Sequence, residues 1–228
     1  MSPGVLQAAW LIARKDLQVS WRSRELIYTT IFFAISCVLV FSFAFVREGQ
    51  PIPNAAAGIL WVAIVFSGTL ALGRTFERER QSETLRALLL SPVERPAIYL
   101  GKLASLLVLL VALELILIPV VGFLFNAPIG RAPWLMAGLL ATGTLGFAGV
   151  GTLFAAMLVR AQSRDVMLPL VLYPMIAPVI LGGVQGTAAI FAEEPNLAIA
   201  EIWLAMLVCF DAVFVTLALW TFAPVMSD

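Results

Sequence analysis

The sequence predicts an all-α integral membrane protein whose single domain, residues 1–228, crosses a bilayer with six helices. Three observations predict this fold. The chain is 61% hydrophobic with a mean hydropathy of +1.00, only 12% of its residues are charged, and its apolar residues fall into six long runs. A water-soluble fold of this size could not bury so much apolar surface in one core. No basic cluster lies on a polar domain, which excludes nucleic-acid binding as a function class.

The first predicted element is an amphipathic helix within residues 1–25. Apolar side chains recur at helical spacing on one face, and polar or basic side chains lie roughly opposite. We predict that this helix lies in the membrane interface, with its tryptophans toward lipid. The alternative is a plain cytoplasmic extension of the first span. The apolar face consists of Leu6, Trp10, Ala13, Leu17 and Trp21, and the opposite face of Lys15, Gln18 and Arg22.

Six apolar stretches follow, and each is long enough to cross a hydrocarbon core of about 30 Å at a rise of about 1.5 Å per residue. Helices are expected because lipid cannot satisfy open backbone groups. Barrel strands would instead appear as short alternating segments. The stretches are 26–46, 55–73, 98–125, 133–159, 166–191 and 198–222.

The positions of lysine and arginine predict the orientation. Of the 14 such residues, all except Arg47 and Arg131 precede the first span, or lie between spans two and three or between spans four and five, with Lys102 just inside the third span. Cytoplasmic segments carry an excess of Lys and Arg. We therefore expect these segments and both termini on the cytoplasmic side.

The fifth stretch contains three prolines, Pro169, Pro174 and Pro178, followed by paired glycines. Proline removes a backbone donor and kinks helices. We therefore predict that this span is kinked and broken. Residues 182–197 are expected to form an outer re-entrant segment or loop, in which 182–191 dips back into the membrane face without crossing it.

The fourth stretch carries glycines at a spacing of three, Gly143, Gly146 and Gly149. Small residues at helical spacing permit a close helix crossing. The pattern indicates a span that lies either at the centre of its bundle or at a dimer contact.

Two carboxyl side chains fall within predicted spans, Glu114 in the third and Asp211 in the sixth. A carboxylate at mid-membrane costs about 2.5–3.5 kcal/mol on insertion scales, so it usually faces protein or water. One interpretation is a proton or substrate site. The other is a protonated or hydrogen-bonded carboxyl that joins two helices. The chain has no histidine, and we predict no metal site.

The longest polar segment is the predicted cytoplasmic loop 74–96. Within it Leu85, Leu88 and Leu89 form an apolar stripe at helical spacing, and Glu83 can pair with Arg86. Pro92 disfavours helix at the residue before it. The pattern is typical of a short helix that docks into a groove on a soluble partner. A solvated loop whose leucines touch the membrane would show the same stripe.

Three segments resemble one family. Glu77–Pro92 resembles the first cytoplasmic loop of ABC-2-type exporter membrane subunits, and more narrowly that of the CcmB family, the haem exporter B proteins of bacterial cytochrome c maturation. Pro169–Ile180 is similar to that family's fifth span. The N-terminal element is similar through Lys15, Asp16, Leu17, Arg22 and Glu25, although Val19 and Ser20 stand where the family often has an acidic residue.

The resemblance covers nearly the whole chain and implies an ABC-2-type, type V exporter-like permease in the bacterial inner membrane. It implies a homodimer that works with a CcmA-like ATPase, CcmC- and CcmD-like membrane subunits and a CcmE-like haem chaperone. ATP hydrolysis on the ATPase would drive haem export or release of the haem-loaded chaperone outside. The chain itself would not be an enzyme and would bind no cofactor directly, while haem would be handled or transported.

The resemblance also implies an elbow helix at Leu6–Arg24, carried by Lys15, Asp16 and Arg22. It implies a coupling helix at about Phe76–Ser91. The chain contains no G-x-x-x-x-G-K-[ST] sequence, so ATP must bind to another polypeptide. The expected ATPase contacts are Phe76, Glu79, Arg80, Glu83, Leu85 and Leu88.

Two other functions remain open at this point. The chain could be an ABC-2 permease for a lipid, a drug or a glycan. It could also be an ion-coupled secondary transporter that uses Glu114 and Asp211. If haem contacts the chain, the possible axial ligands are Met, Cys and Tyr side chains such as Tyr173 and Met175 in the fifth span.

Overall fold

The computed structural model describes residues 4–22, 24–47, 50–51, 55–75, 94–159, 161 and 163–225. Six of its helices are long and apolar enough to cross a membrane, so the prediction of an all-α membrane protein with six spans is confirmed. A two-residue antiparallel strand pair is the one small addition among these residues. The elements are α1 (Val5–Arg22), α2 (Arg24–Ala44), β1 (Val46–Arg47), β2 (Gln50–Pro51), α3 (Ala55–Gly73), α6 (Arg95–Phe125), α7 (Pro133–Met157), α8 (Arg164–Phe191) and α9 (Leu197–Val225).

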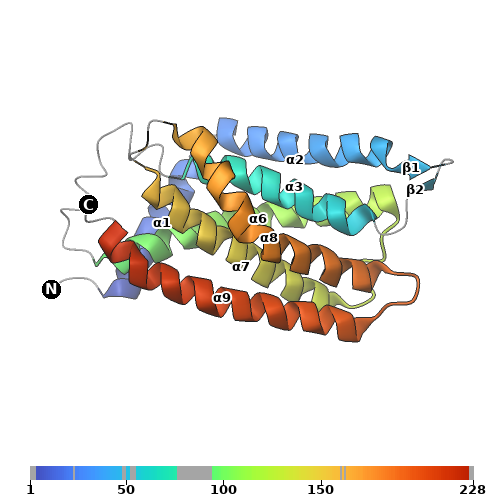
Figure 1. Cartoon of the computed structure of the whole chain (residues 1–228). Helices are drawn as coiled ribbons and strands as arrows, with labels where there is room; N and C mark the ends of the chain where they lie inside the picture. The colour runs from blue at the N-terminus through green and yellow to red at the C-terminus, as the bar shows by residue number, and fades with distance from the viewer. Residues whose placement is uncertain are drawn as a thin grey trace.

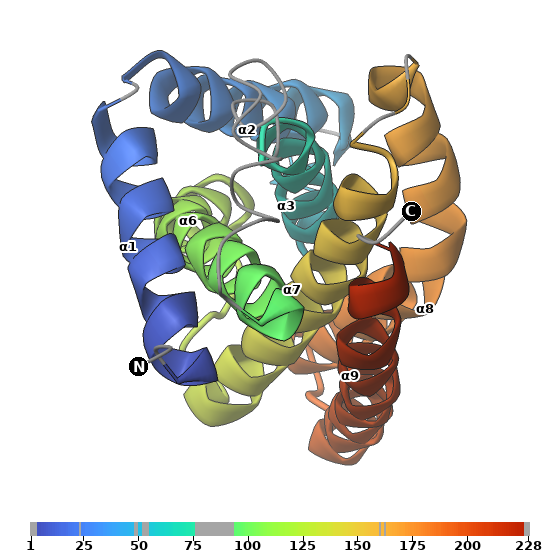
Figure 2. The same cartoon turned by 90° about the vertical axis from the view of Figure 1, so that its left-hand side faces the viewer.

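The six spanning helices run side by side, and α1 lies across one end of them (Figures 1 and 2). The start of α2, the end of α3 and the start of α6 lie at this end, together with the end of α9. The strand pair and the connections 126–132 and 192–196 lie at the opposite end (Figure 1). An even number of crossings therefore brings both ends of the described chain to the side where α1 lies.

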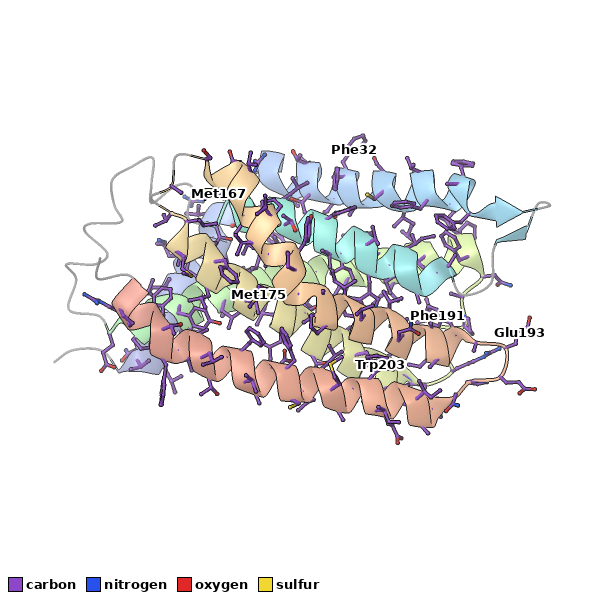
Figure 3. All side chains as sticks on the ribbon, in the orientation of Figure 1. Phe32, Met167, Met175, Phe191, Glu193 and Trp203 are labelled. Atoms are coloured by element: carbon purple, nitrogen blue, oxygen red, sulfur yellow. The ribbon has the colours of Figure 1, made fainter. Side chains whose placement is uncertain are left out.

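Helix α7 forms the centre of the bundle. It is largely buried and packs against α3, α6, α8 and α9, whereas most of α2 and α9 faces outward. Phe32 of α2, for example, points away from the bundle (Figure 3). The glycines of α7 allow this arrangement, because a Cβ at Gly146 would lie 2.7 Å from Oδ1 of Asp211. A central position in the bundle was one of the two interpretations of these glycines.

The predicted break in the fifth span is wrong. Helix α8 contains Pro169, Pro174 and Pro178 and continues without interruption to Phe191. Residues 182–191 are therefore its last turns rather than a re-entrant segment, and only 192–196 connect α8 to α9. Figure 1 shows that α8 changes direction along its length. The physical reason is that a membrane helix can bend at proline while neighbouring helices and local adjustments satisfy the freed backbone groups.

Trp61 of α3 joins three helices inside the bundle. Its side chain is 1% exposed, and its indole Nε1 donates a hydrogen bond of 3.0 Å to Oγ1 of Thr187 on α8. Gly143 of α7 and Gly183 of α8 face its ring, and a Cβ at either position would overlap the ring atoms. The paired glycines that suggested a turn in the sequence instead make room for this indole.

We expect Gly183→Ala to lower the stability of the protein by about 1–3 kcal/mol, because the added methyl group overpacks the core against a rigid ring. Thermal unfolding of the purified protein in detergent measures this change. Gly58→Ala is the matched control, since a Cβ at Gly58 meets no atom within 4 Å. An equal melting temperature for the two variants would contradict the proposed packing of Trp61.

Candidate functional site

The end of the bundle that carries α1 also carries both attachment points of the predicted coupling segment. The segment leaves α3 after Thr75 and returns at Glu94, just before α6. Residues 76–93 lie outside the described part of the chain. The expected ATPase contacts therefore stay predictions: Phe76, Glu79, Arg80, Glu83, Leu85 and Leu88.

A buried lysine of α6 contacts both α1 and the residue that follows α3. Lys102 lies about two turns into α6, and its side chain is 1% exposed. Its Nζ lies 2.9 Å from Oδ2 of Asp16 on α1 and donates a hydrogen bond of 3.1 Å to the carbonyl oxygen of Thr75. Asp16 is mostly buried, and its Oδ1 lies 3.1 Å from Nζ of Lys15. We call the set Asp16, Lys102 and Thr75 the basal junction.

Thr75 is held at the end of α3 by two hydrogen bonds to the last turn of that helix. Its backbone N–H donates to the carbonyl oxygen of Leu72 at 3.0 Å, and its hydroxyl donates to that of Ala71 at 3.3 Å. The hydrogen bond from Lys102 therefore connects the end of α3 to α6. Because Lys102 also pairs with Asp16, the same side chain connects the end of α3 and α6 to α1.

Small residues bring α1 into close contact with α6 beside the basal junction. Ala8 and Ala9 pack against Ala97, and a Cβ at Gly101 would lie 2.8 Å from the carbonyl oxygen of Ala9. Glycine and alanine permit this approach because they place almost no side chain between the two backbones. Helix α1 is therefore held against α6 by the close approach of the two backbones as well as by the ion pair between Asp16 and Lys102.

The predicted apolar face of α1 is exposed at three of its large residues, whereas its one alanine is buried; the position of this face in lipid stays a prediction. Leu6, Trp10 and Trp21 are exposed on the outer surface of the helix. Ala13, which the spacing placed on the same face, is buried like Ile12. The reason is that α6 covers the narrow alanine side of α1, and the sequence pattern alone did not show which helix would pack there.

The predicted elbow residues have different surroundings. Asp16 is the member that forms the basal junction, and Lys15 pairs with it from a half-exposed position. Arg22 is exposed at the last turn of α1. From the sequence, Lys102 served only as one of the positive charges that predict the orientation of the chain in the membrane. Its signal was a lone cation about one turn inside the apolar stretch 98–125, which requires a partner because a charge buried from water is costly unless it is paired.

The two intramembrane carboxyl groups lie on different sides of α7. Glu114 of α6 is 4% exposed and accepts a hydrogen bond from the Thr144 hydroxyl. Asp211 of α9 is 6% exposed, lies next to Gly146, and has no hydrogen-bond partner among the described residues. Residues 144 and 146 point to opposite sides of a helix, since each residue turns the helix by about 100°. The carboxyl groups therefore do not share one site.

The possible haem ligands of the fifth span do not converge either. Tyr173 of α8 makes an edge contact with Phe66 of α3, with ring centroids 6.1 Å apart. Met167 and Met175 lie at different depths along α8 (Figure 3). Within the described ranges, no three His, Cys, Asp or Glu side chains group as metal ligands would.

Comparison with known proteins identifies close relatives. A family model described as CcmB protein matches residues 7–227. The "Heme exporter protein B" of Paracoccus denitrificans is 34% identical over 155 residues, 68% of this chain and 70% of that protein. The protein of the same name from Pseudomonas aeruginosa is 28% identical over 86% of this chain and 87% of its own length. That from Escherichia coli K12 is 33% identical over 42% of this chain and 44% of its own length.

A double-mutant cycle tests the basal junction. Asp16→Ala leaves a buried ammonium group without its carboxylate, so we expect it to cost about 3–5 kcal/mol of stability. Lys102→Ala should cost less, because Asp16 is partly exposed and Lys15 remains beside it. The double variant should be more stable than the sum of the two losses predicts. Thermal unfolding in detergent gives all three values.

Arg22→Ala is the control for this cycle, because it removes an exposed charge from the same helix and should change stability by less than about 0.5 kcal/mol. Strictly additive losses for Asp16→Ala and Lys102→Ala would show that the two side chains do not interact.

Proposed function

We propose that this chain, which belongs to the CcmB family, is the membrane subunit of an ABC transporter for cytochrome c maturation. Its relatives are named for haem export. In the proposed assembly a separate ATPase supplies the energy for haem export, or for release of a haem-loaded chaperone on the outer side. This chain supplies the path for the mechanical signal and performs no catalysis itself.

The proposed partners divide between the two sides of the membrane. A CcmA-like ATPase holds ATP and binds the 74–96 segment, with contacts centred on Glu79, Arg80, Glu83, Leu85 and Leu88. A second copy of this chain and CcmC- and CcmD-like subunits complete the membrane part, and a CcmE-like chaperone receives haem. The basic end of the bundle then faces the cytoplasm of the cell, in accordance with the excess of Lys and Arg there.

The single observation that carries the coupling role is the basal junction. Lys102 forms an ion pair with Asp16 and donates a hydrogen bond to the carbonyl oxygen of Thr75. The coupling segment therefore departs from a point that is linked to α1 and α6 together. A pull on the segment by the ATPase would move the ends of α3, α6 and α1 as one unit. Rigid-body motion of such a unit is an established way to pass a conformational change through packed helices.

The intramembrane carboxyl groups fit a structural role in this proposal. Glu114 already has a hydrogen-bond partner on a neighbouring helix, and Asp211 lies on the other side of α7. ATP supplies the energy, so the mechanism needs no proton pathway through them.

The docking of the ATPase is tested with Leu85→Asp combined with Leu88→Asp. Carboxylates on the apolar stripe should prevent its burial in the ATPase groove while membrane insertion stays intact. Gentle affinity purification, mass spectrometry and an absorption spectrum measure the result. The unaltered chain should recover an ATPase and haem-handling subunits, and the variant should lose the ATPase. Leu85→Met with Leu88→Met is the control that keeps the stripe apolar, and an ATPase that still copurifies with the aspartate variant would contradict the assignment.

The role of the carboxyl groups is tested with Glu114→Gln combined with Asp211→Asn. Glutamine keeps an oxygen that can accept the Thr144 hydrogen bond, so we expect the double variant to support c-type cytochrome assembly in cells at near the level of the unaltered chain. Haem staining of membrane proteins measures the assembled cytochromes. Complete loss of cytochromes, with normal amounts of the variant in the membrane, would favour ion-coupled transport instead.

A further inference from the structure

The first two turns of α6 are contacted from two sides. Ala97 and Gly101 approach α1. Tyr99 lies two residues before Gly101, and two residues turn a helix by about 200°. The tyrosine therefore points to the opposite side, into the bundle, where it is 0% exposed. Figure 2 shows α6 between α1 on one side and α7 and α9 on the other.

Tyr99 makes a polar contact with the central helix. Its hydroxyl donates a hydrogen bond of 3.0 Å to the carbonyl oxygen of Gly149 on α7. A carbonyl oxygen has two lone pairs, so it can accept this bond in addition to the one that it accepts within its own helix. Because the acceptor belongs to the backbone, the bond connects α6 to the helix α7 itself and not to a side chain that can change its rotamer.

The ring of the same tyrosine contacts α9. Its centroid lies 5.4 Å from that of Phe222, at an interplanar angle of 52°, and Phe222 is also 0% exposed. This separation is within the range that aromatic pairs prefer. Phe222 lies in the last turn of α9. One side chain therefore reaches both the backbone of α7 and the end of α9.

Tyr99 and Lys102 divide the contacts of this part of α6 between them. They are three residues apart and lie next to each other on the helix surface. Lys102 connects α6 to α1 and to Thr75, whereas Tyr99 connects it to α7 and α9. The coupling segment returns at Glu94, just before these two turns. The start of α6 is therefore the place where the base of the bundle meets the central helix.

Packing alone does not require the hydroxyl group of Tyr99. A phenylalanine at this position would keep the ring contact with Phe222, and the carbonyl of Gly149 would keep its bond within α7. Removing a hydrogen bond costs most when it leaves a buried polar group unpaired, and removal of this hydroxyl leaves none. The role of the hydroxyl can therefore be tested without disturbing the fold.

We propose that Tyr99 is a positioning residue for coupling, which passes a displacement of the start of α6 to α7 and α9. The hydroxyl keeps the backbone of α7 at a fixed distance from α6, and the ring does the same for the end of α9. The basal junction is then where the signal enters the bundle, and Tyr99 is where it passes from α6 to the central helix. This inference rests on the proposed function, because it needs an ATPase that moves the coupling segment.

The first test is Tyr99→Phe, followed by affinity purification, ATP hydrolysis by the purified complex and haem staining of c-type cytochromes. The variant should reach the membrane in normal amounts, retain the ATPase and hydrolyse ATP. Assembled cytochromes should fall by roughly 2- to 30-fold, the range expected when one side chain carries part of the coupling between two sites. A purely structural role would instead lower the amount of the chain or of the bound ATPase.

Two matched controls accompany this variant. Tyr28→Phe removes the hydroxyl of a tyrosine that is 66% exposed on α2. Gly149→Ala keeps the carbonyl acceptor, and its Cβ would lie 3.5 Å from the hydroxyl oxygen of Tyr99, an ordinary contact. Both controls should assemble cytochromes like the unaltered chain. Unchanged cytochromes in Tyr99→Phe would overturn the proposal, as would loss of the chain or of the ATPase from the membrane.

A second measurement follows the movement itself, in a chain that carries Cys37→Ser and Cys209→Ser. Single reporters are added at exposed positions, Gln18→Cys on α1 or Met157→Cys at the end of α7. A non-hydrolysable ATP analogue should change the rate of maleimide labelling at both positions. With Tyr99→Phe the change should remain at position 18 and disappear at position 157.

A labelling change that persists at both positions in Tyr99→Phe would reject the role of Tyr99 while the transporter assignment stands. If no ATPase copurifies with the unaltered chain, the proposed function fails, and this inference fails with it. The two failures are therefore distinguished by the purification of the unaltered complex.

Discussion

The structure depends on the absence of water from the bilayer interior, which requires polar groups within the bundle to find partners inside the protein. Three side chains meet this requirement by joining two helices each. Trp61 bonds to Thr187, Tyr99 donates to the carbonyl oxygen of Gly149 at 3.0 Å, and Glu114 accepts from Thr144. Two of these bonds end on α7. The central helix is therefore fixed by directional bonds as well as by the close packing that its glycines permit.

The same requirement explains how the end beside α1 can transmit force. A lysine that is 1% exposed cannot exchange its partners for water without a large cost. The contact of Lys102 with Asp16 and Thr75 therefore behaves as a fixed connection between three elements. Together with the alanine contact between α1 and α6, it makes a stiff base from which the coupling segment departs. In the proposed transporter, motion from the ATPase enters the membrane at this base.

Hydropathy alone predicted much of the fold, because a membrane helix must be long, apolar and continuous. The expected third stretch, 98–125, begins three residues inside the observed α6, and the expected fourth, 133–159, ends two residues beyond α7. What could not be predicted depends on which helices pack together. The partner of Lys102, the burial of Ala13 and the place of Trp61 between Gly143 and Gly183 follow from tertiary contacts. Proline gave a misleading signal in α8 because its effect in water-soluble helices is stronger than in a supported membrane helix.

The prolines of α8 divide that helix into two halves with different mechanical properties. Each proline lacks an amide hydrogen, so the segment from Pro169 to Pro178 has fewer internal bonds to resist bending. The following turns are clamped, since Gly183 sits against the Trp61 indole and Thr187 is bonded to it. Compliance is thus concentrated in the half of α8 that is nearer to α1. A deformation that enters at that end would be absorbed as curvature there, while the opposite half keeps its place against α3.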